Sequence, residues 1–248
     1  VINGRPELPA ASTFSRASEA TYVDANGIIQ TAGVDEPRFD YDPETGEFLG
    51  LTLEDARTNL NRFSSSFSGF CGNSTPTPTP LNNQGIAPDG TNTAWLIPAG
   101  ATGFCQYNYT IPANSDFYSW TIYVKALSSD AVASFNLTGI HQINFSPAFN
   151  FSTGIFSGAS NGTVAYVGNG WYKLTQVYRN NNKTLFINRI DINPGNDGKV
   201  LYWGNQVEVG PNPSSYIPTS GSTGTRQPDA FSLTTSSNFD GGFSLLLD

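Results

Sequence analysis

The stretch that decides the fold is VLYWGNQVEVGPNPSSYIPTSGSTGTRQPD, residues 200–229. Its first ten residues alternate apolar and polar side chains, which is typical of a half-buried β-strand. Strict alternation predicts one apolar and one polar face: Leu201, Trp203, Val207 and Val209 against Gln206 and Glu208. Pro211 and Pro213 then end the strand, because proline has no N–H for a sheet ladder. The polar run that follows cannot bury enough apolar area to fold alone, so we expect it to leave the domain as a tether.

Composition favours an all-β chain. Only 13% of the 248 residues are charged, about half the usual share, while 13% are aromatic and Gly and Pro number 25 and 16. Many aromatics and turn formers with few charges are typical of short strands joined by polar loops. The chain is long enough for one sandwich-sized domain with accessory segments.

The clearest expected strand covers residues 117–126. Alternation there places Tyr118, Trp120, Ile122, Val124 and Ala126 on one face, with Ser119, Thr121, Tyr123 and Lys125 on the other. Further expected strands cover residues 93–97, 103–111, 131–138, 162–167, 171–179, 184–190 and 200–209. Their number and spacing predict a two-sheet jelly-roll β-sandwich.

We divide the chain into three parts: a connector arm over 1–57, a jelly-roll domain over 58–215, and a C-terminal linker or tether over 216–248. In the arm, residues 20–23 and 28–30 predict a short hairpin around an Asn26-Gly27 turn. The arm is too small for a core of its own. We therefore expect it to pack on the sandwich, on a neighbouring subunit, or on another part of a larger particle.

The charge and the hydropathy of the sequence argue against two kinds of partner, nucleic acids and the membrane interior. The net charge is −8, and the 12 Lys and Arg residues are scattered, so no basic stripe for nucleic acid exists. No apolar run approaches the length of about 18 residues that spans a membrane. We expect neither nucleic-acid binding nor membrane insertion.

Residues that could carry catalysis are scarce, and we expect no enzymatic activity. His141 is the only histidine, so it alone could serve a nucleophilic triad, and a multi-histidine zinc site is excluded. Cys71 and Cys105 either form a disulfide or are two separately buried thiols. Glycoside hydrolysis needs two facing carboxylates, and within residues 60–210 only Asp191 and Glu208 fall on expected strands.

Three segments carry a resemblance. YWGNQVEVG followed by SSYIPTSGSTGTRQPD resembles the closing signature of a module in bacteriophage tail-fibre and other virion appendage proteins. Residues 14–60 resemble the segment that precedes such modules, and NGWYKLTQVY at 169–178 is similar to a strand motif of jelly-roll carbohydrate-binding modules. The resemblance implies a virion protein of the phage tail or capsid appendage. It also implies other virion proteins as partners and, by analogy with fibres, a trimer.

Sugar binding suits the side chains that are present. Pyranose rings stack on flat aromatic rings, and polar side chains bond the hydroxyl groups. The candidates for a carbohydrate-binding platform on the face opposite the core are Tyr123, Lys125, Trp171 and Arg179, with Tyr107 as a further ring. The competing interpretation is that these aromatics only pack in a core.

Jelly-roll carbohydrate-binding modules often hold a structural calcium ion. That analogy implies Asn59 and Glu208 as ligands, although no calcium-loop motif accompanies them. The expected function is attachment to host-surface polysaccharide, with two alternatives: a purely structural virion connector or decoration protein, and a glycan depolymerase.

Overall fold

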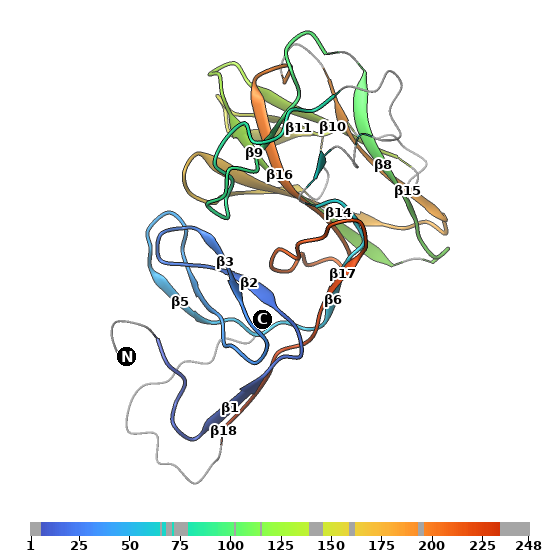
Figure 1. The fold of residues 1–248 in the computed structure, drawn as a ribbon. Coiled ribbons are helices and arrows are strands. Elements are labelled where there is room, and N and C mark those ends of the chain that lie inside the picture. The colour runs from blue at the N-terminus through green and yellow to red at the C-terminus, as the bar shows by residue number, and fades with distance from the viewer. Residues whose placement is uncertain are drawn as a thin grey trace.

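The computed structural model describes residues 6–64, 66–67, 71, 79–101, 103–114, 116–138, 146–158, 162–192 and 196–233. Its named elements are eighteen β-strands, which confirms the expected all-β class. Among the described residues, no helix has the length and apolar character needed to cross a bilayer. A sandwich, an arm beneath it and a narrow ribbon beyond the arm follow one another along the molecule (Figure 1).

Two five-stranded antiparallel sheets form the sandwich. Sheet I has the order β12 (Ile155–Ser157), β11 (Ala148–Asn150), β10 (Val132–Thr138), β15 (Leu185–Asp191) and β8 (Phe104–Thr110). Sheet II has the order β13 (Gly162–Tyr166), β14 (Trp171–Arg179), β9 (Phe117–Ala126), β16 (Val200–Val209) and β7 (Trp95–Leu96). The expected two-sheet sandwich is confirmed.

Large aromatic and aliphatic side chains fill the space between the two sheets. The inner face of β9 matches the alternation in the sequence, since Tyr118, Trp120, Ile122 and Val124 are all fully buried there. Trp120 meets Phe135 of sheet I edge to face, with 5.0 Å between ring centroids. Cys71 and Cys105 form a disulfide that closes a loop of 34 positions, which decides between the two alternatives left by the sequence.

Strand β16 differs from the simple alternation of its sequence. The register against β9 shifts between Trp203 and Gln206, which is a β-bulge. Gly204 supplies the positive φ of 65° at this point. As a result, Trp203, Gln206 and Glu208 lie opposite Tyr123, Thr121 and Ser119 of β9, on the outer face of sheet II. Val207 stays in the inner core, so the predicted grouping of Trp203 with Val207 is wrong.

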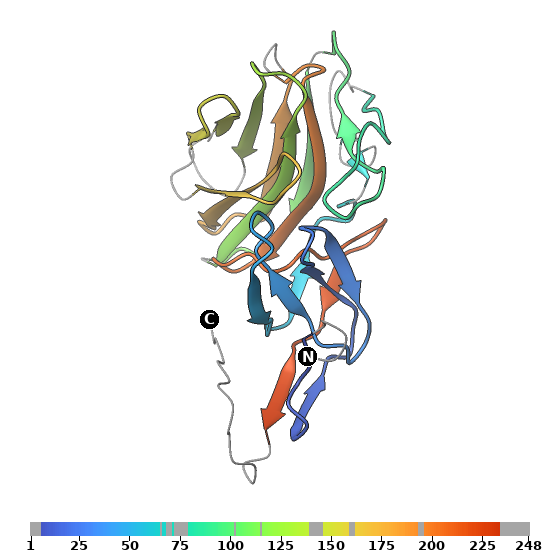
Figure 2. The same cartoon turned by 90° about the vertical axis from the view of Figure 1, so that its left-hand side faces the viewer.

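The arm consists of short two-stranded pairings. β2 (Ala20–Val23) pairs with β3 (Ile29–Ala32), as the Asn-Gly turn predicts, and β4 (Phe39–Tyr41) pairs with β5 (Phe48–Leu51). The arm leads into the sandwich through β6 (Arg57–Asn59), and the backbone N–H of Ile29 in the arm donates to Pro88 O of the sandwich domain at 2.9 Å. Of the three packing partners left open by the sequence, the structure therefore places the arm on the sandwich (Figure 2).

The C-terminal segment returns to the arm, which corrects the expected tether over residues 216–233. β17 (Gly224–Arg226) pairs with β6, and β18 (Ala230–Leu233) pairs with β1 (Ser12–Ser15). Tyr216 and Ile217 are each 6% exposed. The polar composition is compatible with this docking because much of it consists of hydrogen-bonding groups that pair with the arm. Residues 234–248 of the expected tether lie outside the described residues.

A buried cluster of charges joins the arm to the C-terminal segment. Asp229 accepts from Arg16 at 3.0 Å and also from Arg38, and Glu54 accepts from Arg38 at 2.7 Å and Arg226 at 2.9 Å. All three arginines are at most 1% exposed. We call these five residues the arginine cluster. Burying such charges is costly unless each is paired, so the two anions hold the three cations in place only while both segments are docked.

Candidate functional site

The outer face of sheet II, where the sequence predicts a sugar platform, is covered by the chain itself. Tyr123 is 4% exposed and packs edge to face on Trp203, with centroids 5.3 Å apart. Tyr216 of the C-terminal segment lies over Trp203 at 4.4 Å. Trp171 is 1% exposed, and its indole N–H donates to the carbonyl oxygen of Ile86 at 3.0 Å. These rings therefore form a second core under the arm and the loop that contains Ile86.

Of the other three predicted sugar-binding residues, Lys125 lies directly opposite Trp171, whereas Arg179 and Tyr107 lie elsewhere. Lys125 shares the outer face of sheet II, and its ammonium donates to Asn169 O at 2.7 Å. Arg179 lies at the far end of β14, 5.9 Å from the ring of Phe117. Tyr107 lies on the side of β8 that faces the sandwich core, stacked edge to face on Tyr109 at 4.8 Å. The structure does not bring the five residues together as one platform.

The predicted calcium ligands do not fit a cation. Asn59 Oδ1 accepts from the backbone N–H groups of Asn61 and Val207, at 3.0 and 3.1 Å. Both carboxylate oxygens of Glu208 accept from Ser214, one from its backbone N–H at 3.0 Å and one from its hydroxyl. A cation would have to displace these donors. Within the part of the chain that is described, no group of three or more His, Cys, Asp or Glu side chains gathers as a metal site would.

The two carboxylates considered for glycoside hydrolysis lie on opposite sides of the sandwich. Asp191 points outward from sheet I and pairs with Arg189 at 2.6 Å. Glu208 lies on the outer face of sheet II. They cannot flank one glycosidic bond. His141 lies outside the described residues.

A cavity of about 460 Å³ remains where the arm meets the sandwich. This size is typical of small-ligand sites. Tyr22, Tyr41 and Leu49 line it from the arm, and Tyr123 and Lys173 line it from sheet II. Aromatic walls with a few polar groups are the combination that sugar recognition requires. We call this space the arm–sandwich cavity.

Lys173 is the cationic group of this cavity. It lies opposite Tyr123 on the outer face of sheet II and is partly buried. Among the described residues, no carboxylate lies within ion-pair distance of its ammonium group. Burial lowers the pKa of Lys173, and the more distant carboxylates of Glu208, Glu54 and Asp40 act in the opposite direction.

The acidic groups that line the cavity, Asp40, Asp42 and Glu54, already accept hydrogen bonds from the chain. Asp42 Oδ1 accepts from the backbone N–H groups of Glu44 and Thr45, at 2.9 and 2.7 Å. Asp40 accepts from the Val23 backbone N–H and from the Thr52 hydroxyl, both at 2.7 Å. Glu54 accepts from the backbone and side chain of Ser215, both at 2.7 Å, besides its two arginines. Donors in the arm and in the C-terminal segment therefore occupy these carboxylates, whereas the Lys173 ammonium retains donor capacity.

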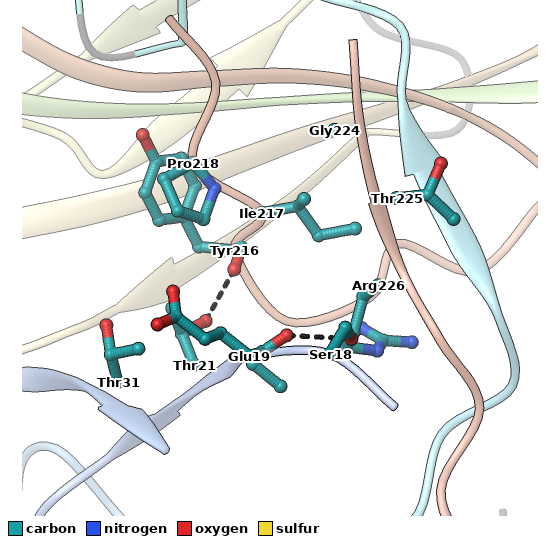
Figure 3. A pocket seen from close by; sticks show the side chains of 11 residues that line it. Ser18, Glu19, Thr21, Thr31, Tyr216, Ile217, Pro218, Gly224, Thr225 and Arg226 are labelled. Atoms are coloured by element: carbon teal, nitrogen blue, oxygen red, sulfur yellow. Dashed lines mark hydrogen bonds between the residues drawn. The ribbon is translucent and has the colours of Figure 1, made fainter. Parts of the chain in front are cut away.

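A smaller cavity of about 260 Å³ lies between the arm and the docked C-terminal segment (Figure 3). Its lining includes Ser18, Glu19 and Thr31 of the arm and Pro218 and Thr225 of the C-terminal segment. The Thr21 hydroxyl donates to the Tyr216 carbonyl oxygen between the two segments, at 2.5 Å. This cavity carries fewer aromatic walls than the arm–sandwich cavity and is the weaker candidate for sugar binding.

Alternation along residues 171–179 puts Lys173 on the same face as Trp171 and Arg179, but no signal singles it out. Its place opposite Tyr123 depends on the pairing of β14 with β9, which the pattern of one strand does not encode. No local signal marked Tyr22, Tyr41 or Leu49, because the cavity exists only once the arm has docked. Docking brings these three residues to the cavity that Lys173 lines, more than 120 positions later in the sequence, which a pattern of neighbours does not encode.

Comparison with known proteins gives structural likeness only. No protein-family model and no curated protein sequence matches the chain. One similar structure is a Paenibacillus sp. cycloisomaltooligosaccharide glucanotransferase complexed with cycloisomaltoheptaose, at 13% identity and TM-score 0.30, covering 53% of this chain and 16% of that chain. Another holds the CBM22-1 and GH10 modules of the Clostridium thermocellum N-terminal endo-1,4-β-D-xylanase 10B complexed with xylohexaose. It has 11% identity and TM-score 0.36, and the match covers 67% of this chain and 30% of that chain. The chain spans less than a third of either protein, and at such TM-scores we draw neither fold nor function from the likeness.

Proposed function

We propose that this chain is a non-enzymatic glycan-binding component of a bacteriophage tail fibre or related virion appendage. The observation that carries the glycan-binding part is the arm–sandwich cavity, with Tyr123 and Lys173 in its wall. Its volume suits one or two sugar residues, and its lining combines apolar surface with free donor capacity. The virion location rests on the resemblance of residues 14–60 and 200–229 to phage appendage modules.

Binding at one such cavity is expected to be weak. Several copies in one particle would raise the overall strength through effective concentration, without any new contact. Host-surface polysaccharide, with its repeated units, is the partner that this arrangement suits.

The test fills the cavity without removing a packed side chain. Ala165 is exposed on the edge strand β13, lies opposite Lys173 and lines the cavity. An Ala165→Trp variant of the full chain should lose glycan binding on a polysaccharide array and by calorimetry. Thr163→Trp is the matched control, since Thr163 is exposed on the same strand and face but does not line the cavity. If both variants bind glycan as well as the parent chain does, the arm–sandwich cavity is not the binding site.

The second candidate function is a purely structural virion connector. The burial of Tyr123 and Trp171 beneath the chain's own arm favours it, because rings that stabilise a fold need no ligand. It predicts no glycan binding at millimolar concentration and unchanged particle attachment in Ala165→Trp.

A separate experiment tests the proposed absence of glycan hydrolysis. The full chain is incubated with the oligosaccharides that the array identifies, and the mixture is analysed for shortened products.

A further inference from the structure

We propose that the arm–sandwich cavity selects acidic glycans, and that the Lys173 ammonium binds the carboxylate of a uronic acid. This inference rests on the proposed function and names the class of sugar for the same site. Its starting point is the Lys173 ammonium, which has no ion-pair partner among the described residues, in a cavity whose carboxylates Asp40, Asp42 and Glu54 are all engaged by other donors.

A cation that is withdrawn from water without a partner is costly to the folded protein. The fully buried cations among the described residues avoid that cost: Arg16, Arg38 and Arg226 each meet a carboxylate within 3.0 Å. Lys173 is partly buried and has no such partner in the described part of the chain. An anionic ligand would supply the missing partner.

The carboxylates nearest to Lys173 do not fill that role. Glu54 is held by Arg38 and Arg226. Both oxygens of Asp40 and both oxygens of Glu208 accept hydrogen bonds from backbone or hydroxyl donors. These carboxylates are engaged by other donors, and none forms an ion pair with Lys173 among the described residues, so the Lys173 N–H donors remain available to the cavity.

The aromatic part of the wall supports a sugar over a small inorganic anion. Tyr22 and Tyr41 of the arm are partly exposed and line the same cavity as Lys173, whereas Tyr123 in the same wall is covered by Trp203 and Tyr216. A hexuronic acid offers an apolar C–H face to such a ring and a carboxylate to the ammonium, whereas phosphate or sulfate alone would leave the apolar wall without a partner.

The experiment compares matched sugars on the full chain. The probes are uronic-acid polysaccharides and their carboxyl-reduced forms, which keep the linkage and lose the charge. Affinity for at least one acidic member should exceed that for its reduced form at least tenfold and should fall as salt is raised. Lys173→Met should abolish this preference, and Lys173→Arg should retain most of it.

Lys199→Met is the charge-matched control, because Lys199 pairs with Asp130 on the surface away from the cavity. It should keep the preference for the acidic member. Thermal unfolding of Lys173→Met separates a folding defect from a binding defect, since removal of an unpaired ammonium should leave the midpoint unchanged or raise it.

The outcomes distinguish the two levels of the proposal. Equal affinity for acidic and reduced forms, or a preference that survives Lys173→Met, overturns the acidic specificity and leaves glycan binding in place. No binding to any member of either set overturns the proposed function, and the specificity with it.

Discussion

Arg16 and Asp229, 213 positions apart in the sequence, form an ion pair of 3.0 Å in which neither side chain is exposed to solvent. Asp229 also holds Arg38, so one carboxylate joins two parts of the arm to the C-terminal segment. The backbone N–H of Glu54 donates to the same carboxylate at 2.9 Å. Asp229 is therefore the residue on which docking of the C-terminal segment most depends.

Replacing Asp229 with Asn should destabilise the protein by about 3–5 kcal/mol, because two buried arginines lose their anionic partner. Urea unfolding followed by tryptophan fluorescence measures the change. Lys199→Ala, which breaks the partly exposed pair with Asp130, should leave the midpoint almost unchanged. Similar small effects for both variants would contradict the role of the arginine cluster.

Docking of the C-terminal segment on the arm should weaken in acid, because the Glu54 carboxylate becomes protonated. Burial alone would raise its pKa, but the attraction of Arg226 and Arg38 and the hydrogen bonds from Ser215 outweigh it and lower the pKa below 4.5. A carboxyl with a depressed folded-state pKa stabilises the fold above its unfolded pKa, and the benefit is lost as pH falls through the folded value. Stability should thus decline below about pH 4.5, and the decline should be shallower in Glu54→Gln. An identical acid profile for the variant and the parent would contradict this assignment.

Trp171→Ala should destabilise the fold by about 3–5 kcal/mol, as for other fully buried aromatics, because it leaves a void beneath the loop that contains Ile86. Phe117→Ala is the control on the same sheet, since Phe117 is 41% exposed. Chemical unfolding measures both. A Trp171→Ala chain of parental stability would mean that the indole is not a packing element.

The bulge in β16 should be sensitive to a single methyl group. A Cβ on Gly204 would lie 2.7 Å from Cδ2 of Tyr123, at a φ of 65° that L-residues disfavour. The conformational penalty alone is about 1–2 kcal/mol, and displacement of the Tyr123 ring adds to it. Gly204→Ala should therefore lower the unfolding midpoint, whereas Gly221→Ala, with a φ of 88° but open space around its Cβ, should cost only the conformational part.

The disulfide should be worth about 4 kcal/mol by the chain-entropy account, given its separation of 34 positions. The double variant Cys71→Ser and Cys105→Ser should unfold at a correspondingly lower urea concentration. Reduction of the parent chain under mild conditions should lower its midpoint in the same direction. Reduction of the double variant should have no effect.

The sequence predicted the sandwich better than it predicted the site. Residues 117–126 carry an unbroken apolar series on one face, so the extent and the inner face of this strand followed from pattern alone, and the extent of 171–179 was predicted as well. Alternation failed at Gly204, because a bulge inserts residues that the pattern does not count. The cover over Tyr123 was not predictable, since it depends on pairings such as Arg38 with Asp229, 191 positions apart. A polar composition around Tyr216 suggested a linker where the structure has a docked segment.

The pairing of β1 with β18 has a mechanical consequence. Ser12 lies across from Leu233 and Ser15 across from Ala230, so the chain enters and leaves through one two-stranded ribbon. Tension applied to the two strands at the Ser12–Leu233 end would open that ribbon one rung at a time. The force would then act on the arginine cluster. The sandwich would bear no load until the β1–β18 ribbon and the arginine cluster had both separated.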